Sequence, residues 1–97
     1  MISYLYRKVI LTKRAKKDLA RVPSHILMKF KLWVDLVSYR GLEVARITPG
    51  YNDELLKGNL KGYRSIRLSR SYRAVYRQSL EGEIELIEVI KVNKHEY

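Results

Sequence analysis

A row of apolar side chains at helical spacing between Ile26 and Val37 constrains the fold of this chain more than any other feature. Its members recur every three or four residues, the period of one helix face: Ile26, Leu27, Phe30, Trp33, Val34 and Val37. Large aromatic and aliphatic side chains at this spacing attach a helix to a core. Because Pro23 and Ser24 precede the row, we expect a helix over residues 24–38 that packs against a sheet.

Segments rich in Tyr, Val, Ile and Leu flank this helix and predict strands. Residues 4–11 form one such segment, and Thr12 after it is a typical helix cap, so we expect a strand and then a helix over residues 13–22. Three more strands are expected over residues 63–68, 72–78 and 84–94, joined by short turns. Short turns favour an antiparallel meander for these three strands.

The order strand, helix, helix, three strands predicts an α+β fold. The two N-terminal helices are expected to pack on one face of a small, largely antiparallel four-stranded sheet, which leaves the other face open for binding. The 97 residues suit a single domain spanning positions 1–97. Residues 39–61 are rich in Gly, Pro and Asn and predict a long irregular connection, which in compact domains is often functional.

The charge of the chain indicates a polyanionic partner. Twenty Lys and Arg against ten Asp and Glu give a formal net charge of +10, which favours nucleic acid. No acidic residue occurs from Leu55 to Leu80, a stretch that contains the cations Lys57, Lys61, Arg64, Arg67, Arg70, Arg73 and Arg77. Strand arginines can bind phosphates and the interleaved tyrosines can stack on bases, a combination that suits single-stranded nucleic acid. The alternative is a basic surface that only aids solubility.

The end of the chain offers acid–base groups. Lys91, Asn93, His95 and Tyr97 have the same parity, so an extended strand would direct all four side chains to one side. Histidine is the one side chain type whose unperturbed titration falls near neutral pH, and a tyrosine hydroxyl among cations loses its proton more easily, so His95 and Tyr97 are candidate acid–base groups. Cysteine is absent, the two histidines and the acids have no recognisable ligand spacing, and we expect neither a metal nor a cofactor. RNA allows metal-free cleavage because its own 2′-hydroxyl can attack the phosphate.

The sequence also favours a cytoplasmic protein without a membrane partner. It begins without a secretory signal pattern, and no apolar stretch approaches the ~18 residues that a membrane span needs. A chain without cysteine suits a reducing compartment.

Two neighbouring motifs occupy the centre of the chain: residues 56–62 read L-K-x-x-L-x-G before a predicted strand, and residues 72–76 read Y-R-x-V-Y within the next one. As a pair they resemble the RelE/ParE toxin superfamily, and especially its YoeB-like ribonuclease branch. The likeness is specific from about Glu54 to Tyr76 and in the tail, while the order of elements agrees over the whole chain. It implies a type II toxin that cleaves mRNA in the ribosomal A site and is held inactive by a cognate antitoxin.

The resemblance also implies roles for individual residues. Glu54 matches a carboxylate proposed as general base, Arg73 matches an arginine on the scissile phosphate, and Lys57 and Arg67 match supporting cations. His and Tyr are adjacent in the YoeB-like tail, whereas here Glu96 separates them, so the general acid is either His95 or Tyr97. Other branches use a site rich in Lys or Arg with a tail tyrosine, and in that version Glu54 would be only a structural acid. The residues that could supply it are Lys57, Lys61, Arg64 and Arg73, with Arg77 as a further phosphate-binding candidate.

Two rival functions remain open. A toxin of the ParE branch shares the fold but poisons DNA gyrase through protein contacts without cutting RNA. A plain RNA-binding module would use the same basic surface without catalysis. The nature of the damaged nucleic acid distinguishes them: truncated mRNA indicates the ribonuclease, broken gyrase-linked DNA the gyrase poison, and intact nucleic acid the binding module.

Overall fold

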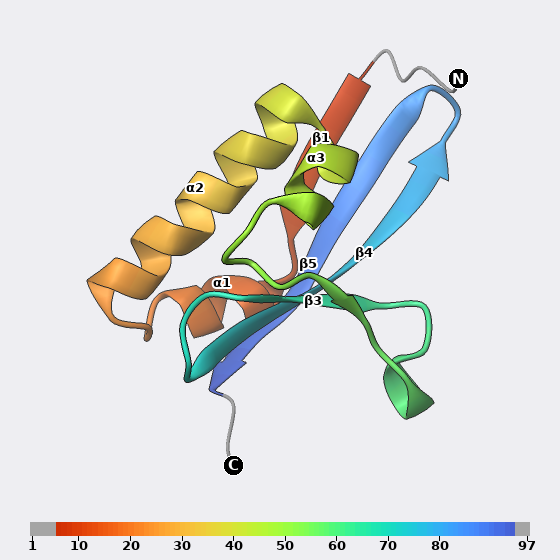
Figure 1. Ribbon diagram of the computed structural model, residues 1–97. Helices are drawn as coiled ribbons and strands as arrows, with labels where there is room; N and C mark the ends of the chain where they lie inside the picture. Colours follow the sequence, from red (N-terminus) through yellow and green to blue (C-terminus); the bar gives the residue numbers. More distant parts are fainter. Residues whose placement is uncertain (1–5, 95–97) are drawn as a thin grey trace.

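The protein, seen in a computed structural model that describes residues 6–94, is a sheet covered by helices on one face (Figure 1). Its elements in chain order are β1 (Tyr6–Leu11), α1 (Lys13–Leu19), α2 (Ser24–Arg40), α3 (Leu42–Ile47), β2 (Glu54–Leu55), the 3-10 helix η1 (Gly58–Leu60), β3 (Arg64–Arg67), β4 (Tyr72–Glu81) and β5 (Ile84–Lys94). The α+β class and the sequence of strand, helices and meander are confirmed. The described residues form a sheet of five strands rather than four, and three α-helices rather than two.

Local sequence explains the first two helices. The Thr12 hydroxyl accepts a hydrogen bond from the backbone N–H of Ala15 at 3.0 Å and so caps α1, as expected. This helix ends earlier than predicted because the N–H of Arg21 bonds to the carbonyl of Asp18, only three residues back. Helix α2 buries the expected apolar row through Ile26, Phe30, Trp33 and Val37. The apolar period therefore predicted the face of α2 correctly.

The sheet has the strand order β1-β5-β4-β3-β2. The predicted meander is confirmed, since β3, β4 and β5 pair antiparallel in succession, while β1 pairs with β5 in parallel at one edge. Helix α1 packs on β1 and β5, and α2 packs on β1. Between helices and sheet lies the core, where the rings of Trp33 and Tyr76 approach to 5.2 Å between centroids and Ile66, Ile87 and Val89 are fully buried.

The connection between α2 and β3 is more ordered than predicted. Gly41 has φ of 91°, a conformation that favours glycine, and there the chain turns from α2 into α3. Helix α3 is held by burial of Leu42 and Ala45, one helical turn apart. Strand β2 has only two residues and depends on pairing with β3. Helix α3 and strand β2 both depend on tertiary contacts, and the turn-forming residues of this segment therefore predicted an irregular connection instead.

An irregularity in β5 determines which side chains reach the open face. Val75 pairs with Lys91 but the next residue, Tyr76, pairs with Val89, so Ile90 is an extra residue in β5. The carbonyl of Ile90 accepts a hydrogen bond from the Thr12 hydroxyl at 2.6 Å. Val89 and Val92 are both buried although they differ in parity, which shows that the bulge exchanges the faces of β5.

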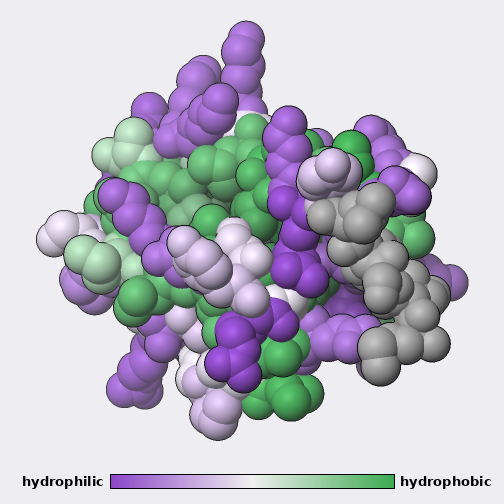
Figure 2. Space-filling view, turned by 90° about the horizontal axis from the view of Figure 1, so that it is seen from above, coloured by the Kyte–Doolittle hydropathy of each residue, from purple (hydrophilic) through white to green (hydrophobic). Residues whose placement is uncertain are grey.

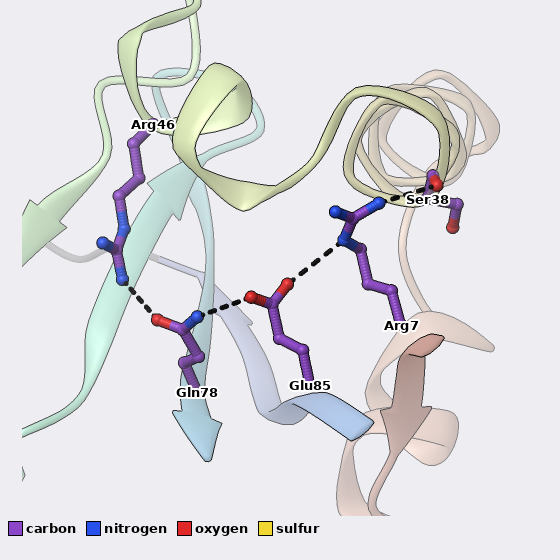
Figure 3. Close-up of polar contacts among 5 residues, drawn as sticks. All are labelled: Arg7, Ser38, Arg46, Gln78 and Glu85. Atoms are coloured by element: carbon purple, nitrogen blue, oxygen red, sulfur yellow. Dashed lines mark hydrogen bonds and ion pairs between the residues drawn. The ribbon is translucent and has the colours of Figure 1, made fainter. Parts of the chain in front are cut away.

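A connected set of side-chain hydrogen bonds links the helices to the sheet on the face opposite the open one (Figure 3). Glu85, whose side chain is 4% exposed, accepts hydrogen bonds from Arg7 at 3.2 Å and from Gln78 at 2.9 Å. Arg7 also donates to the carbonyl of Ser38 near the end of α2, and Arg46 of α3 donates to Gln78. Both oxygens of the buried carboxylate thereby have a hydrogen-bond donor.

From above, Figure 2 shows hydrophilic side chains projecting around the rim and hydrophobic ones gathered between them.

Candidate nucleic-acid site on the open face

Two rows of cross-strand partners cross the open face of the sheet. The first runs from β2 to β5 through Glu54, Ser65, Val75 and Lys91. The second runs from β3 to β5 through Arg67, Arg73 and Asn93. Directly opposed residues share a face, so these side chains gather on the side away from the helices. Except for Arg67, they border a pocket of about 270 Å³, lined by Glu54, Leu56, Leu60, Ser65, Arg73, Val75, Lys91 and Asn93.

Arg73 is fixed in position on the wall of this pocket. One of its terminal nitrogens, Nη1, donates to Glu54 Oε1 at 2.8 Å and to Ser65 Oγ at 3.3 Å. The Arg73 side chain is 19% exposed, whereas Glu54 is 52% exposed. Because Ser65 is buried beneath it, the guanidinium is held from below and can still reach a ligand above. A planar guanidinium held in this way is suited to a phosphate group.

The pocket carries excess positive charge. Arg67 lies directly opposite Arg73 in the β3–β4 pair, and like charges in that position repel each other. Lys91 adds another cation to the lining, while Glu54 is the single carboxylate among the described lining residues. A bound anion would relieve this repulsion, so the arrangement favours a phosphate over a neutral ligand.

Glu54 reaches the pocket because its neighbour Asp53 is anchored on the opposite face. The Asp53 carboxylate is fully buried, accepts a hydrogen bond from Arg64 Nε at 2.6 Å and accepts another from the hydroxyl of Tyr76. Successive residues of an extended segment point to opposite faces, so this anchor directs Glu54 toward Arg73. The contacts of Asp53 thus help to position Glu54, although Glu54 takes no part in them.

The same anchor changes two pKa values. Burial raises the pKa of the Tyr76 hydroxyl above its usual range, and the hydrogen bond to Asp53 raises it further. Burial lowers the pKa of the Arg64 guanidinium, but its hydrogen bond and attraction to Asp53 outweigh that effect, so the net change is upward. Tyr76 therefore stays neutral and Arg64 charged, which keeps the Asp53 anchor intact.

The other residues predicted for the site lie in different surroundings. Lys57 and Lys61 are exposed beside η1. Arg64 belongs to the Asp53 anchor and does not border the pocket. Arg77 bonds to Glu88 at 2.8 Å, which raises its pKa, and its guanidinium lies 5.8 Å from the centre of the Tyr63 ring. The structure therefore brings Glu54 and Arg73 together in the pocket, with Arg67 opposite Arg73 in the neighbouring strand but not among the lining residues. The predicted roles of His95 and Tyr97 fall outside the described residues.

Sequence reasoning missed several members of the pocket. Ser65 supports Arg73, and the apolar residues Leu56, Leu60 and Val75 supply the remaining walls. Lys91 and Asn93 shared the parity of the tail residues but were not assigned to the site. Their shared parity grouped them on one side of the strand, but which face that side takes depended on the bulge in β5, and the part played by Ser65 depended on the strand register.

Two further properties bear on what the site can hold. Within residues 6–94, no three His, Asp or Glu side chains form a group that could hold a metal ion. None of the described helices has the length and apolar character needed to cross a membrane.

Comparison with known proteins gives a family and a set of related structures. The family model described as "ParE toxin of type II toxin-antitoxin system, parDE" matches residues 9–96. The YoeB/ParE toxin from Agrobacterium tumefaciens has 28% sequence identity and a TM-score of 0.69, with 92% of this chain and 99% of that chain covered. No curated protein matches the sequence.

Two toxin–antitoxin complexes have the same toxin fold at lower identity. The Escherichia coli DinJ–YafQ toxin–antitoxin complex contains a chain with 20% identity and a TM-score of 0.70, with 94% of each chain covered. The archaeal RelE–RelB complex from Pyrococcus horikoshii contains one with 24% identity and a TM-score of 0.67, covering 92% of this chain and 93% of that chain. With a family match over almost its whole length, this chain belongs to the RelE/ParE superfamily of toxins of type II toxin–antitoxin systems.

Proposed function

We propose that this toxin is a metal-independent endoribonuclease that cleaves mRNA, with the open-face pocket as its active site. The observation that carries the proposal is the pair formed by Arg73 and Glu54, a phosphate-binding group and a base 2.8 Å apart. RNA cleavage without a metal needs a base, an acid and cations on the phosphoryl oxygens. The pocket supplies the base and the cations.

The reaction begins when a carboxylate oxygen of Glu54 takes the proton of the 2′-hydroxyl. The 2′-oxygen then forms a bond to the adjacent phosphorus, and the bond from phosphorus to the 5′-oxygen breaks on the opposite side. The electron pair of that bond leaves with the 5′-oxygen, which is protonated by His95 or Tyr97. A 2′,3′-cyclic phosphate and a 5′-hydroxyl are the products. Alternatively, His95 takes the first proton.

Arg73 and Arg67 stabilise the charge that develops on the phosphoryl oxygens. Both lie in one cross-strand row, so a phosphate placed above them is reached by two guanidinium groups. Arg73 is already oriented by Ser65 and Glu54 before RNA binds. Orientation before binding matters because such groups stabilise a transition state without reorganising during the reaction.

The proposed partners follow from the charge and from the related complexes. RelE is bound to RelB and YafQ to DinJ in their solved complexes. We expect a cognate antitoxin here as well, acidic or amphipathic to complement a net charge of +10. The other partners are mRNA and ribosomal RNA in the A site, with the cytoplasm as the place of action. Lys57 and Lys61 are exposed beside η1, next in the chain to the lining residues Leu56 and Leu60, and would extend the contact with RNA.

The direct test replaces Arg73 with Ala and follows mRNA cleavage on programmed ribosomes. Arg40→Ala, which removes an exposed arginine at the end of α2, is the matched control. We expect a loss of roughly 10²–10³-fold for Arg73→Ala, as for removal of one transition-state donor, and no loss for Arg40→Ala. Undiminished cleavage by a folded Arg73→Ala protein would refute the assignment.

A second candidate function is poisoning of DNA gyrase, which is favoured by the name of the matching family, the ParE toxin. The open-face pocket would then have no catalytic role. Induction of the toxin in cells separates the two candidates, because gyrase poisoning yields protein-linked DNA breaks and an SOS response, whereas mRNA cleavage yields truncated transcripts. Substitution of Glu54 or Arg73 would leave gyrase poisoning intact.

A further inference from the structure

Lys91 lies on the wall of the pocket, although regular alternation along β5 would direct its side chain to the opposite face. It is half-buried, lines the pocket and pairs across the sheet with Val75. Within residues 6–94 it forms no ion pair, whereas Arg73 is bound to Glu54 and Arg77 to Glu88. Lys91 is therefore a cation of the pocket whose charge the described carboxylates do not neutralise.

The bulge in β5 is what turns Lys91 toward the pocket. Val89 is fully buried against the helices, and in a regular strand Lys91, two residues later, would share that apolar face. The extra residue Ile90 exchanges the faces, so that Val92 enters the core and Lys91 borders the pocket. Bulges commonly reorient a side chain beside an active site.

Lys91 stands on the side of the pocket opposite Glu54. Both belong to one cross-strand row, with β3 and β4 between their strands. Three strand spacings separate their backbones by about 14 Å, so the two long side chains extend toward a phosphate from opposite sides. An in-line attack has the same geometry, because the nucleophile enters on one side of phosphorus and the leaving oxygen departs on the other.

We propose that Lys91 is a further catalytic residue, whose ammonium group binds the departing 5′-oxygen while Glu54 acts on the 2′-hydroxyl. The inference rests on the proposed ribonuclease function and refines it. As the bond from phosphorus to the 5′-oxygen breaks, its electron pair accumulates on that oxygen. Lys91 donates a hydrogen bond to it and remains an ammonium ion, and the tail acid supplies the proton that completes the 5′-hydroxyl.

A change of leaving atom tests this role. The substrate is a short mRNA on programmed ribosomes, with either the normal 5′-oxygen or a 5′-bridging sulfur at the cleaved linkage. A thiolate leaves readily without stabilisation. We expect Lys91→Met to lower the single-turnover rate roughly 10²-fold on the oxygen substrate and to approach the unmodified toxin on the sulfur substrate. Glu54→Gln should be slow on both, because the base is still needed.

Matched variants make the result decisive. Lys94→Met removes a lysine of the same strand whose cross-strand partner, Tyr72, packs against the core, and it should leave both rates unchanged. Lys91→Arg retains a cation and should keep most of the oxygen rate. An equal loss on both substrates for Lys91→Met, or an Arg variant as slow as Met, would overturn the proposal. If the unmodified toxin cuts neither substrate, the ribonuclease function itself fails.

Discussion

Removal of the Tyr76 hydroxyl probes the anchor that positions Glu54. Tyr76 is fully buried, its ring packs 5.2 Å from that of Trp33, and its hydroxyl donates to the buried carboxylate of Asp53. Tyr76→Phe preserves the ring and deletes only the donor. Arg64 remains bound to Asp53, so the carboxylate keeps one of its two partners.

The expected loss of stability follows from the kind of hydrogen bond removed. A hydrogen bond to a charged group contributes ~1.5–3 kcal/mol to the free energy of unfolding, and we take about 2 kcal/mol for this one. In a domain of 97 residues, that loss corresponds to a fall in Tm of about 8–16 °C. No cavity is created, so the loss should stay below that of a truncation in the core.

Thermal unfolding at neutral pH measures the effect, with urea unfolding to give the free energy. Tyr39→Phe serves as the control because Tyr39 is 84% exposed, and its change should stay within about 0.5 kcal/mol. A Tyr76→Phe protein as stable as the unmodified one would refute the reasoning that the hydroxyl stabilises the Asp53 anchor.

Three other perturbations give independent outcomes. The pKa of Tyr76 is raised from 10.0, so the stabilisation by its neutral hydroxyl is complete below pH 10 and is lost as the pH rises toward the folded-state pKa. The difference in the free energy of unfolding between the unmodified protein and Tyr76→Phe should therefore shrink above pH 10. A difference that stays constant would contradict this. Arg67→Ala should reduce the salt dependence of RNA binding by about one phosphate contact with little change in Tm. Arg64→Ala should instead lower Tm, because it removes the cationic partner of the buried Asp53 carboxylate; an equal effect of both substitutions on the salt dependence would refute this distinction between the two arginines. Trp33→Ala should cost ~3–5 kcal/mol in urea unfolding because Trp33 is fully buried, and a loss under 1 kcal/mol would contradict its place in the core.

The parts of the fold that the sequence predicted correctly are those with a local cause. The apolar row of α2, the cap of α1 at Thr12 and the three strands of the meander each follow from periodicity or turn chemistry near in sequence. Strand β2 and helix α3 escaped prediction because two to six residues carry too short a pattern, and both depend on neighbours distant in sequence.

The candidate site was predictable to the extent that side chains follow strand parity. Arg67 and Arg73 face the pocket side as alternation requires, and Arg64 has the opposite parity to Arg67. Residue type grouped Arg64 with the phosphate-binding cations although its parity set it with Ile66 and Leu68, and its bond to the buried Asp53 confirms that it belongs to the helix side. The bulge at Ile90 has no sequence signature, so the exposure of Lys91 to the pocket had to be seen in the structure.

The central claim is that the Glu54–Arg73 pocket cleaves RNA through the 2′-hydroxyl. The most direct measurement compares two mRNAs on programmed ribosomes that differ only by a 2′-deoxy nucleotide at the cleaved linkage, with the end groups of the products determined. The account predicts that the normal mRNA yields a 2′,3′-cyclic phosphate and a 5′-hydroxyl, and that the 2′-deoxy mRNA stays intact. Equal cleavage of both mRNAs, or no cleavage of either, would contradict it.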